Sequence, residues 1–164
     1  MKDPMKTAAS CALFSLALSG LTLTASAGDN AGSQVPHSLI GAWTSVVTHV
    51  DCVSGSPANP PPFKAHETFN LGGTYNQFGV SLGNRRSVGF GTWRRTGGTT
   101  FSASFTFFSF DAASGAIPVA IVRVDRQITI SGPHELSSTN KSTITTLDGI
   151  PLATACATEA GTRL

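Results

Sequence analysis

The chain has 164 residues, of which 40% are hydrophobic and only 12% are charged, and its formal net charge at pH 7 is +2. Because the few basic residues form no polybasic run, nucleic acid is not an expected partner. Past residue 27 no stretch of the sequence approaches the roughly 20 apolar residues of a membrane-spanning helix, so stable membrane insertion is not expected either.

The start of the chain has the pattern of a secretory signal peptide, over residues 1–27. Lys2 and Lys6 form a basic start, residues 8–24 are apolar, and Ala25-Ser26-Ala27 is a small-residue cleavage site. We therefore expect cleavage near Ala27 and a secreted or periplasmic protein.

The 137 residues that follow (164 minus 27) are enough for one domain with its own core. Residues 28–38 are polar and are expected to form a flexible N-terminal lead-in. Residues 39–164 alternate apolar and polar positions in eight runs, which glycine-rich turns separate. This pattern predicts an all-β fold, an eight-stranded antiparallel up-and-down β-barrel. The expected strands are 39–51, 63–70, 74–82, 87–96, 99–110, 117–130, 135–147 and 150–162.

Two cysteines remain after cleavage, Cys52 at the end of the first expected strand and Cys156 in the last. In an oxidising compartment such a pair is most simply a disulfide. The bond would make the first and last strands neighbours and close the barrel. In the chain-entropy model a closed loop of about 100 residues contributes roughly 4–5 kcal/mol. The alternative is two buried free thiols.

Residues 54–62 form the longest connection and are rich in proline, so they predict an irregular loop. This loop is expected to lie over one mouth of the barrel, either as a lid or entrance or as a stiff surface strap.

Three glycine-containing turns, Gly72-Gly73, Gly97-Gly98 and Asp148-Gly149, are expected to be two-residue hairpin loops, which set the register of their strands. The resulting pairs are Glu67 with Phe78, Phe69 with Asn76, Phe90 with Phe105, Val88 with Phe107, Ile144 with Ala153 and Ser142 with Ala155.

The alternation of side chains then predicts the lining of the interior. Phenylalanines of one wall face Ala153, Ala155 and Ala157 of another, so the interior is either an interdigitated core or a cavity. The expected ligand-binding residues are Trp43, Phe78, Phe90, Phe101, Phe105, Phe107, Asn76 and Asn140.

Four ionisable residues are also expected inside. If Cys52 lies directly opposite Cys156, His49 falls opposite Glu159, while Glu67 and Arg126 stand between apolar neighbours on their own strands. Buried charges are costly unless they are paired. One interpretation is a catalytic cluster of His49, Glu159, Arg126 and Glu67, with a His–carboxylate general base and Arg126 stabilising negative charge. The other is a set of rim residues satisfied by water or by structural ion pairs.

Arg85, Arg86, Arg94 and Arg95 lie at the two ends of one expected strand. They indicate either an anion-binding rim or, more commonly, the solvated ends of hairpins. The four histidines lack the spacing of metal ligands, and no phosphate-binding glycine loop or nucleophile elbow is present, so neither a metal nor a cofactor is expected.

Gly41-Ala42-Trp43, in the first strand of an eight-strand meander, resembles the Gly-x-Trp of lipocalins, members of the calycin superfamily. The resemblance implies a small exported barrel of lipocalin-like type. It also implies that Trp43 closes the barrel floor by packing on an arginine near the last strand, here Arg163.

Two functions are compatible with these observations. The first is an exported barrel that binds a small apolar or amphipathic ligand in its interior. The second is a cofactor-free barrel enzyme, a cyclase, isomerase or lyase, that uses the enclosed cluster for acid–base catalysis. A barrel with a packed core and a structural role is a third interpretation. Outward-facing Ile40, Val46 and Val50 fit a homo-oligomer, or the ordinary scatter of apolar surface residues.

Overall fold

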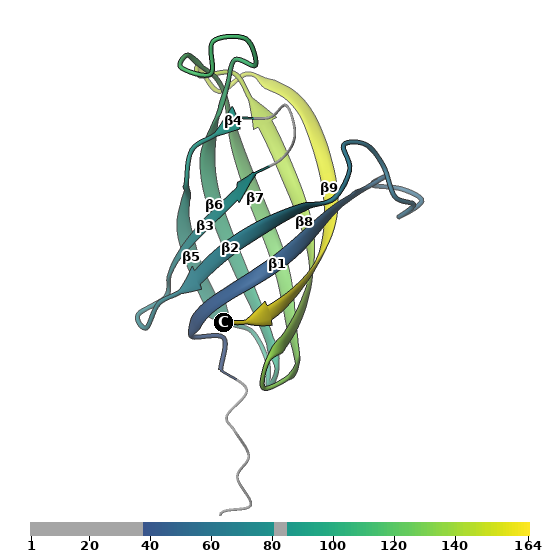
Figure 1. Cartoon of the computed structure of the whole chain (residues 1–164), viewed down its shortest axis with the longest axis vertical. Helices are drawn as coiled ribbons and strands as arrows, with labels where there is room; N and C mark the ends of the chain where they lie inside the picture. Colours follow the sequence, from purple (N-terminus) through teal and green to yellow (C-terminus); the bar gives the residue numbers. More distant parts are fainter. Residues whose placement is uncertain (1–37, 81–84) are drawn as a thin grey trace, which may run out of the picture. The chain divides into compact units, whose positions relative to one another are not determined.

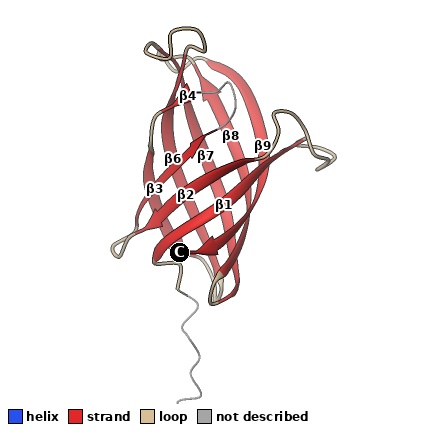
Figure 2. Ribbon diagram, in the orientation of Figure 1, coloured by secondary structure: helices blue, strands red, loops and turns tan. Residues whose placement is uncertain are grey.

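The computed structural model describes residues 38–80 and 85–164. The expected signal peptide (1–27) lies outside these residues, and so does all of the lead-in except residue 38. Within them the chain forms one antiparallel sheet (Figure 2), and no described helix has the length and apolarity needed to cross a membrane. The strands are β1 (Gly41–Val50), β2 (Phe63–Phe69), β3 (Thr74–Val80), β4 (Arg85–Arg86), β5 (Gly89–Arg95), β6 (Thr100–Phe110), β7 (Pro118–Gly132), β8 (Glu135–Thr145) and β9 (Pro151–Arg163).

The sheet closes on itself because β1 pairs with β9 and β6 pairs with β7 (Figure 1). Around the wall the strands follow in the order β1, β2, β3, β5, β6, β7, β8 and β9, each antiparallel to the next. The expected fourth strand, 87–96, corresponds to β5, and the two-residue β4, which precedes it, pairs with β6 beyond the end of β5. The predicted eight-stranded antiparallel barrel is confirmed.

The wall of the barrel is uneven in height. Strands β6 to β9 have 11 to 15 residues, whereas β2, β3 and β5 have 7 each. In Figure 1 the longer strands continue past the shorter ones at the upper end. There the inner face of β9 is partly uncovered, since Ala153 is exposed and Ala155 is half-buried. The interior is therefore open to solvent at the upper end.

Two of the three expected hairpin registers are wrong by one residue. Glu67 pairs with Gln77 instead of Phe78, and Phe90 pairs with Thr106 instead of Phe105. The reason is the loop length: Asn70 bonds to Thr74, which leaves three loop residues, and the β5–β6 turn likewise has three. A slip of one residue moves a side chain to the other face of the sheet.

The third expected register, with Ile144 opposite Ala153, is confirmed. Its turn is also one residue longer than expected, since Thr146 bonds to Ile150. An irregularity between Ile144 and Thr145 compensates for the extra loop residue.

The lower part of the barrel is filled with large apolar side chains. Trp43, Phe69 and Phe101 are fully buried or nearly so, and the Phe69 ring lies edge-on to Trp93 at 6.1 Å between centroids. Here the interior is a packed hydrophobic core.

The disulfide between Cys52 and Cys156 is confirmed, with a Cα–Cα distance of 5.2 Å. The two cysteines are not directly opposed, because Cys156 pairs with Val50 and Cys52 lies in the turn that follows β1. As a result His49 pairs with Ala157 and not with Glu159, which was the expected partner. Because this offset is two residues, the inward-facing side chains of both strands remain as predicted.

The proline-rich loop is held at the upper end of β1. Its first part, Asp51 to Gly55, borders a groove on the outer side of the wall together with Lys141 and Thr158. Val50 forms a bridge with Pro57, and the Ala58 amide donates to the His49 carbonyl. The loop therefore continues the β1 edge at the upper end, and residues 51–59 are exposed.

Candidate functional site

The centre of the barrel holds a buried ionic cluster. Arg126, on β7, lies between Glu67 of β2 and Glu159 of β9, and none of the three side chains is exposed. Its Nη2 is 2.7 Å from Glu159 Oε2, and its Nη1 donates to Glu67 Oε2. The expectation that Glu67 and Arg126 each have a partner is thus confirmed.

Polar side chains surround this cluster. Ser45 donates to Glu159 Oε1, and Asn140 Nδ2 donates to Glu159 Oε2 at 3.2 Å. Ser138 Oγ accepts from Arg126 Nη2 at 3.0 Å. The Tyr75 hydroxyl donates to Glu67 and accepts from Arg126. These bonds satisfy most polar atoms of the cluster, as a buried network requires.

The two glutamates of the cluster differ in acidity. Burial and the nearby Glu67 carboxylate raise the pKa of Glu159 to about 7, although Arg126 opposes this shift. Burial also disfavours ionisation of Glu67, but Arg126 and hydrogen bonds outweigh it, so the pKa of Glu67 is lowered. Glu67 Oε1 finds no hydrogen-bond partner among the described residues.

Above this cluster lies a small cavity of about 60 Å³. Its apolar lining includes Phe63, Phe105 and Ala155, and its polar lining includes His49, Gln77, Asn140 and Ser142. This volume accommodates a few water molecules or one end of a small ligand. Above it the inner face of β9 is partly uncovered, at Ala153 and Ala155.

His49 lines this cavity but lies outside the ionic cluster. Burial lowers its pKa, and a hydrogen bond to the Pro60 carbonyl only partly opposes the shift, so the ring is neutral at pH 7. Its ring packs against Phe63 with 5.7 Å between centroids. Within the described part of the chain its buried Nδ1 has no hydrogen-bond partner. An acceptor is therefore available at the cavity wall.

Arg86 is a second inward-pointing arginine, and the expected set of site residues did not include it. Its Nη2 donates to Gln77 Oε1 at 2.7 Å, and its guanidinium carbon lies 4.0 Å from the Phe107 ring centroid. Its Nε is buried with no hydrogen-bond partner in the described chain. Burial lowers the pKa of Arg86 to about 10, which still leaves it charged at neutral pH.

Five of the eight expected ligand-binding residues face inward: Trp43, Phe101, Phe105, Phe107 and Asn140. Of these, Phe105 and Asn140 line the cavity. The placement of Phe78, Phe90 and Asn76 inside was wrong. Phe78 is 46% exposed and Phe90 is 65% exposed, on the outer face. The three-residue turns turn these side chains outward, and Tyr75 and Gln77 occupy the inward positions instead.

Trp43 closes the lower end of the barrel. Its indole Nε1 donates to the Leu39 carbonyl at 2.9 Å, and the Arg163 guanidinium lies 4.3 Å from its ring centroid. Arg163 also donates to the carbonyls of Ser38 and Ile40. Trp43 thus packs on Arg163 as the resemblance implied, and it forms part of the floor, away from the cavity lining.

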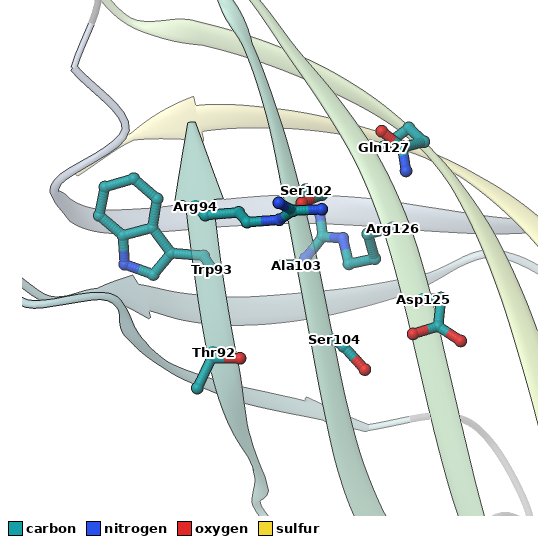
Figure 3. A pocket seen from close by; sticks show the side chains of 9 residues that line it. All are labelled: Thr92, Trp93, Arg94, Ser102, Ala103, Ser104, Asp125, Arg126 and Gln127. Atoms are coloured by element: carbon teal, nitrogen blue, oxygen red, sulfur yellow. The ribbon is translucent and has the colours of Figure 1, made fainter. Parts of the chain in front are cut away.

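A larger but open groove of about 310 Å³ lies on the outer face of β5, β6 and β7 (Figure 3). Its lining is polar and includes Arg94, Ser102 and Gln127. Asp125, at its edge, pairs with Arg123 on the exposed surface. Arg126 borders the groove but directs its guanidinium inward. The groove is open to solvent, and we do not propose it as the functional site.

Comparisons with family models, with curated proteins and with solved structures found no match to this chain. Among residues 38–80 and 85–164, no group of three or more His, Cys, Asp or Glu side chains is placed to hold a metal ion. The barrel is consistent with a calycin-like architecture. The function must therefore be argued from the interior itself.

Proposed function

We propose that this barrel binds a small amphipathic molecule in its upper interior. The main support is the cavity above the ionic cluster, which combines phenylalanine and alanine walls with polar groups, among them His49, whose Nδ1 has no hydrogen-bond partner in the described chain. Binding sites for small molecules are mostly apolar with a few placed polar groups. A cavity of about 60 Å³ takes only one end of such a ligand, so its remainder occupies the open upper end.

Two further features support a lipocalin-like protein that works outside the cytoplasm. The packing of Trp43 on Arg163 repeats the floor arrangement that the resemblance implies. The disulfide between Cys52 and Cys156 suits an oxidising compartment, as does the expected signal peptide over residues 1–27. On this proposal the protein is exported and carries or captures its ligand there.

The direct test is native mass spectrometry of the protein purified from its own host, followed by extraction and identification of bound molecules. A stoichiometric amphipathic molecule is expected. A clean apo mass that stays unchanged across a library of such molecules would argue for a packed structural barrel.

A matched pair of variants locates the binding site. Ala155→Leu places a larger side chain at the cavity wall, whereas Ala160→Leu makes the same change on the outer face of the same strand. Only Ala155→Leu is expected to weaken binding. If both variants bind the extracted molecule like the wild type, the ligand lies elsewhere on the protein.

A cofactor-free enzyme is the second candidate, and one observation favours it. The neutral His49 presents an unpartnered Nδ1 at the cavity wall, which is the form a general base requires. Glu159, Glu67 and Arg126 lie behind Asn140 and would act as positioning groups. If catalysis occurs, His49→Gln abolishes turnover and leaves ligand affinity largely unchanged. Under pure binding, His49→Gln changes affinity alone.

A further inference from the structure

We infer that Arg86 is an anion-binding residue in the upper interior, so that the ligand of this site carries a carboxylate or another acidic group next to an apolar segment. This inference rests on the proposed ligand-binding function and names the chemical class of the ligand.

The first argument is the incomplete pairing of Arg86. An arginine has five N–H donors, and a guanidinium in an enclosed setting is costly unless anions or several acceptors satisfy it. Arg86 has a neutral partner, the Gln77 amide oxygen, and its Nε finds no acceptor in the described chain. Within residues 38–80 and 85–164 no carboxylate lies within ion-pair distance of it.

The second argument is the charge balance of the interior. Glu67 and Glu159 both pair with Arg126, so neither forms an ion pair with Arg86, although both attract its charge from a distance. The interior thus holds two guanidinium groups and two carboxyl groups, and it gains an excess of positive charge when Glu159, whose pKa is raised to about 7, takes up a proton. A bound anion next to Arg86 restores the balance.

The third argument is the position of Arg86. Gln77, its hydrogen-bond partner, lines the cavity, and Phe107, on which it stacks, packs against Phe105 of the cavity wall at 6.2 Å between centroids. An arginine that is stacked on a ring keeps its planar fork fixed for a bidentate carboxylate. The anionic group and the apolar walls are therefore close enough to contact one amphipathic molecule.

Arg85 offers a matched control. It precedes Arg86 in the same two-residue strand, but its side chain is exposed. Removal of either arginine changes the net charge of the protein by the same amount. Only Arg86 should matter for the inferred site, whereas long-range attraction of anions would involve both.

The experiment compares acids with uncharged isosteres. Four compounds are tested: hexanoate, octanoate and the primary amide of each. Each compound is titrated into the wild type, Arg86→Gln and Arg85→Gln, and binding is measured by calorimetry. For the wild type and Arg85→Gln we expect each acid to bind about tenfold more tightly than its amide, because charge-assisted hydrogen bonds are stronger than neutral ones. For Arg86→Gln we expect acid and amide to bind within about twofold of each other, the amide affinity being unchanged.

Four results would overturn the inference. If the wild type binds acid and amide equally, or if Arg86→Gln keeps the preference, Arg86 is not the anion-binding group although the ligand-binding function stands. If neither compound of either pair binds the wild type, the proposed function fails together with the inference. If inorganic phosphate binds at Arg86 and the acids bind no more tightly, the site recognises free anions only.

Thermal unfolding of the variants distinguishes a loss of binding from a loss of folding. Arg86→Gln should melt at or above the wild-type temperature without ligand, because it removes an incompletely paired charge. Arg86→Lys keeps the charge and should retain part of the preference for acids. If Arg86→Gln melts far below the wild type, Arg86 has a structural role and the inference is wrong.

Discussion

Arg126 and Glu159 form an ion pair at the centre of the barrel, with 2.7 Å between Nη2 and Oε2 and no exposure of either side chain. Glu67 binds the same guanidinium through Nη1. The three residues come from β7, β9 and β2, so the cluster ties together strands from different parts of the wall. This pairing offsets the free-energy cost of burying the charges inside an apolar barrel. The charge of Arg126 also lowers the pKa of both carboxyl groups, against the effect of burial.

We predict that Arg126→Met strongly destabilises the protein, because it leaves two carboxyl groups buried without their cation. Breaking a buried pair in this way typically costs about 3–5 kcal/mol. Urea unfolding of the variant and the wild type at neutral pH measures the loss. Arg123→Met is the control, since its side chain is 61% exposed and its pair with Asp125 is worth at most about 1 kcal/mol. Equal losses in the two variants would show that the central pair has no special role.

The raised pKa of Glu159 predicts that stability depends on pH. The folded protein binds this proton more tightly than the unfolded chain does, so the stabilisation is full below the ordinary value of 4.5 and is lost as the pH rises to about 7. The lowered pKa of Glu67 acts in the opposite direction, and its contribution is lost as the pH falls below 4.5 through the folded value. Urea midpoints measured across this range should decline toward pH 7.

Glu159→Gln tests the assignment of that decline. The variant should lose the fall in stability between pH 4.5 and about 7, because an amide does not titrate. Glu135→Gln changes an exposed glutamate and should keep the wild-type profile. If Glu159→Gln keeps the fall as well, another group is responsible for it.

Alternation along the strands was enough to predict much of this interior. Arg126 stands between Val124 and Ile128 at alternate positions of its strand, and Glu67 stands in the same way between Ala65 and Phe69. Because alternate side chains point to the same face, both charged residues were predicted to face the interior of the barrel. Long strands with uninterrupted alternation, such as β6 and β7, allow this inference because one buried face specifies the register.

Loop length was the part that the sequence did not reveal. Gly72 and Gly73 both have positive φ, as a two-residue hairpin turn requires, yet Leu71 also belongs to the loop. The same glycine pair thus fits two registers. The difference of one residue moved Tyr75 into the interior and Phe78 out of it.

The sequence named Arg86 in a possible anion-binding rim, but its inward position was not predicted, for a related reason. Residues 87 and 88 interrupt the strand between β4 and β5, so the alternation of the fourth expected strand does not extend to Arg86. A pair of arginines at the end of a hairpin strand is ordinarily solvated. Only the contact with Gln77 and Phe107 shows that one of the two points inward.

The disulfide should contribute a large part of the stability. It closes a loop with a sequence separation of 104 residues and joins the end of β1 to β9. We expect Cys52→Ser/Cys156→Ser to lose about 2–5 kcal/mol, most of it through the greater freedom of the unfolded chain. Urea unfolding with and without a reductant checks this. The reductant should lower the midpoint of the wild type and leave that of the variant unchanged; a wild type insensitive to complete reduction would contradict the prediction.

Gly41 should be essential to the floor of the barrel. Its φ is +133°, which other residues rarely adopt, and a Cβ atom there would lie 2.7 Å from Nη1 of Arg163, the residue that packs on Trp43. We predict that Gly41→Ala costs about 1–3 kcal/mol, because backbone strain adds to the displaced arginine. Thermal and urea unfolding measure the loss, with Gly98→Ala as control, since Gly98 has open space and no positive φ. Similar stability of the two variants would mean that the contact between Gly41 and Arg163 does not support the floor.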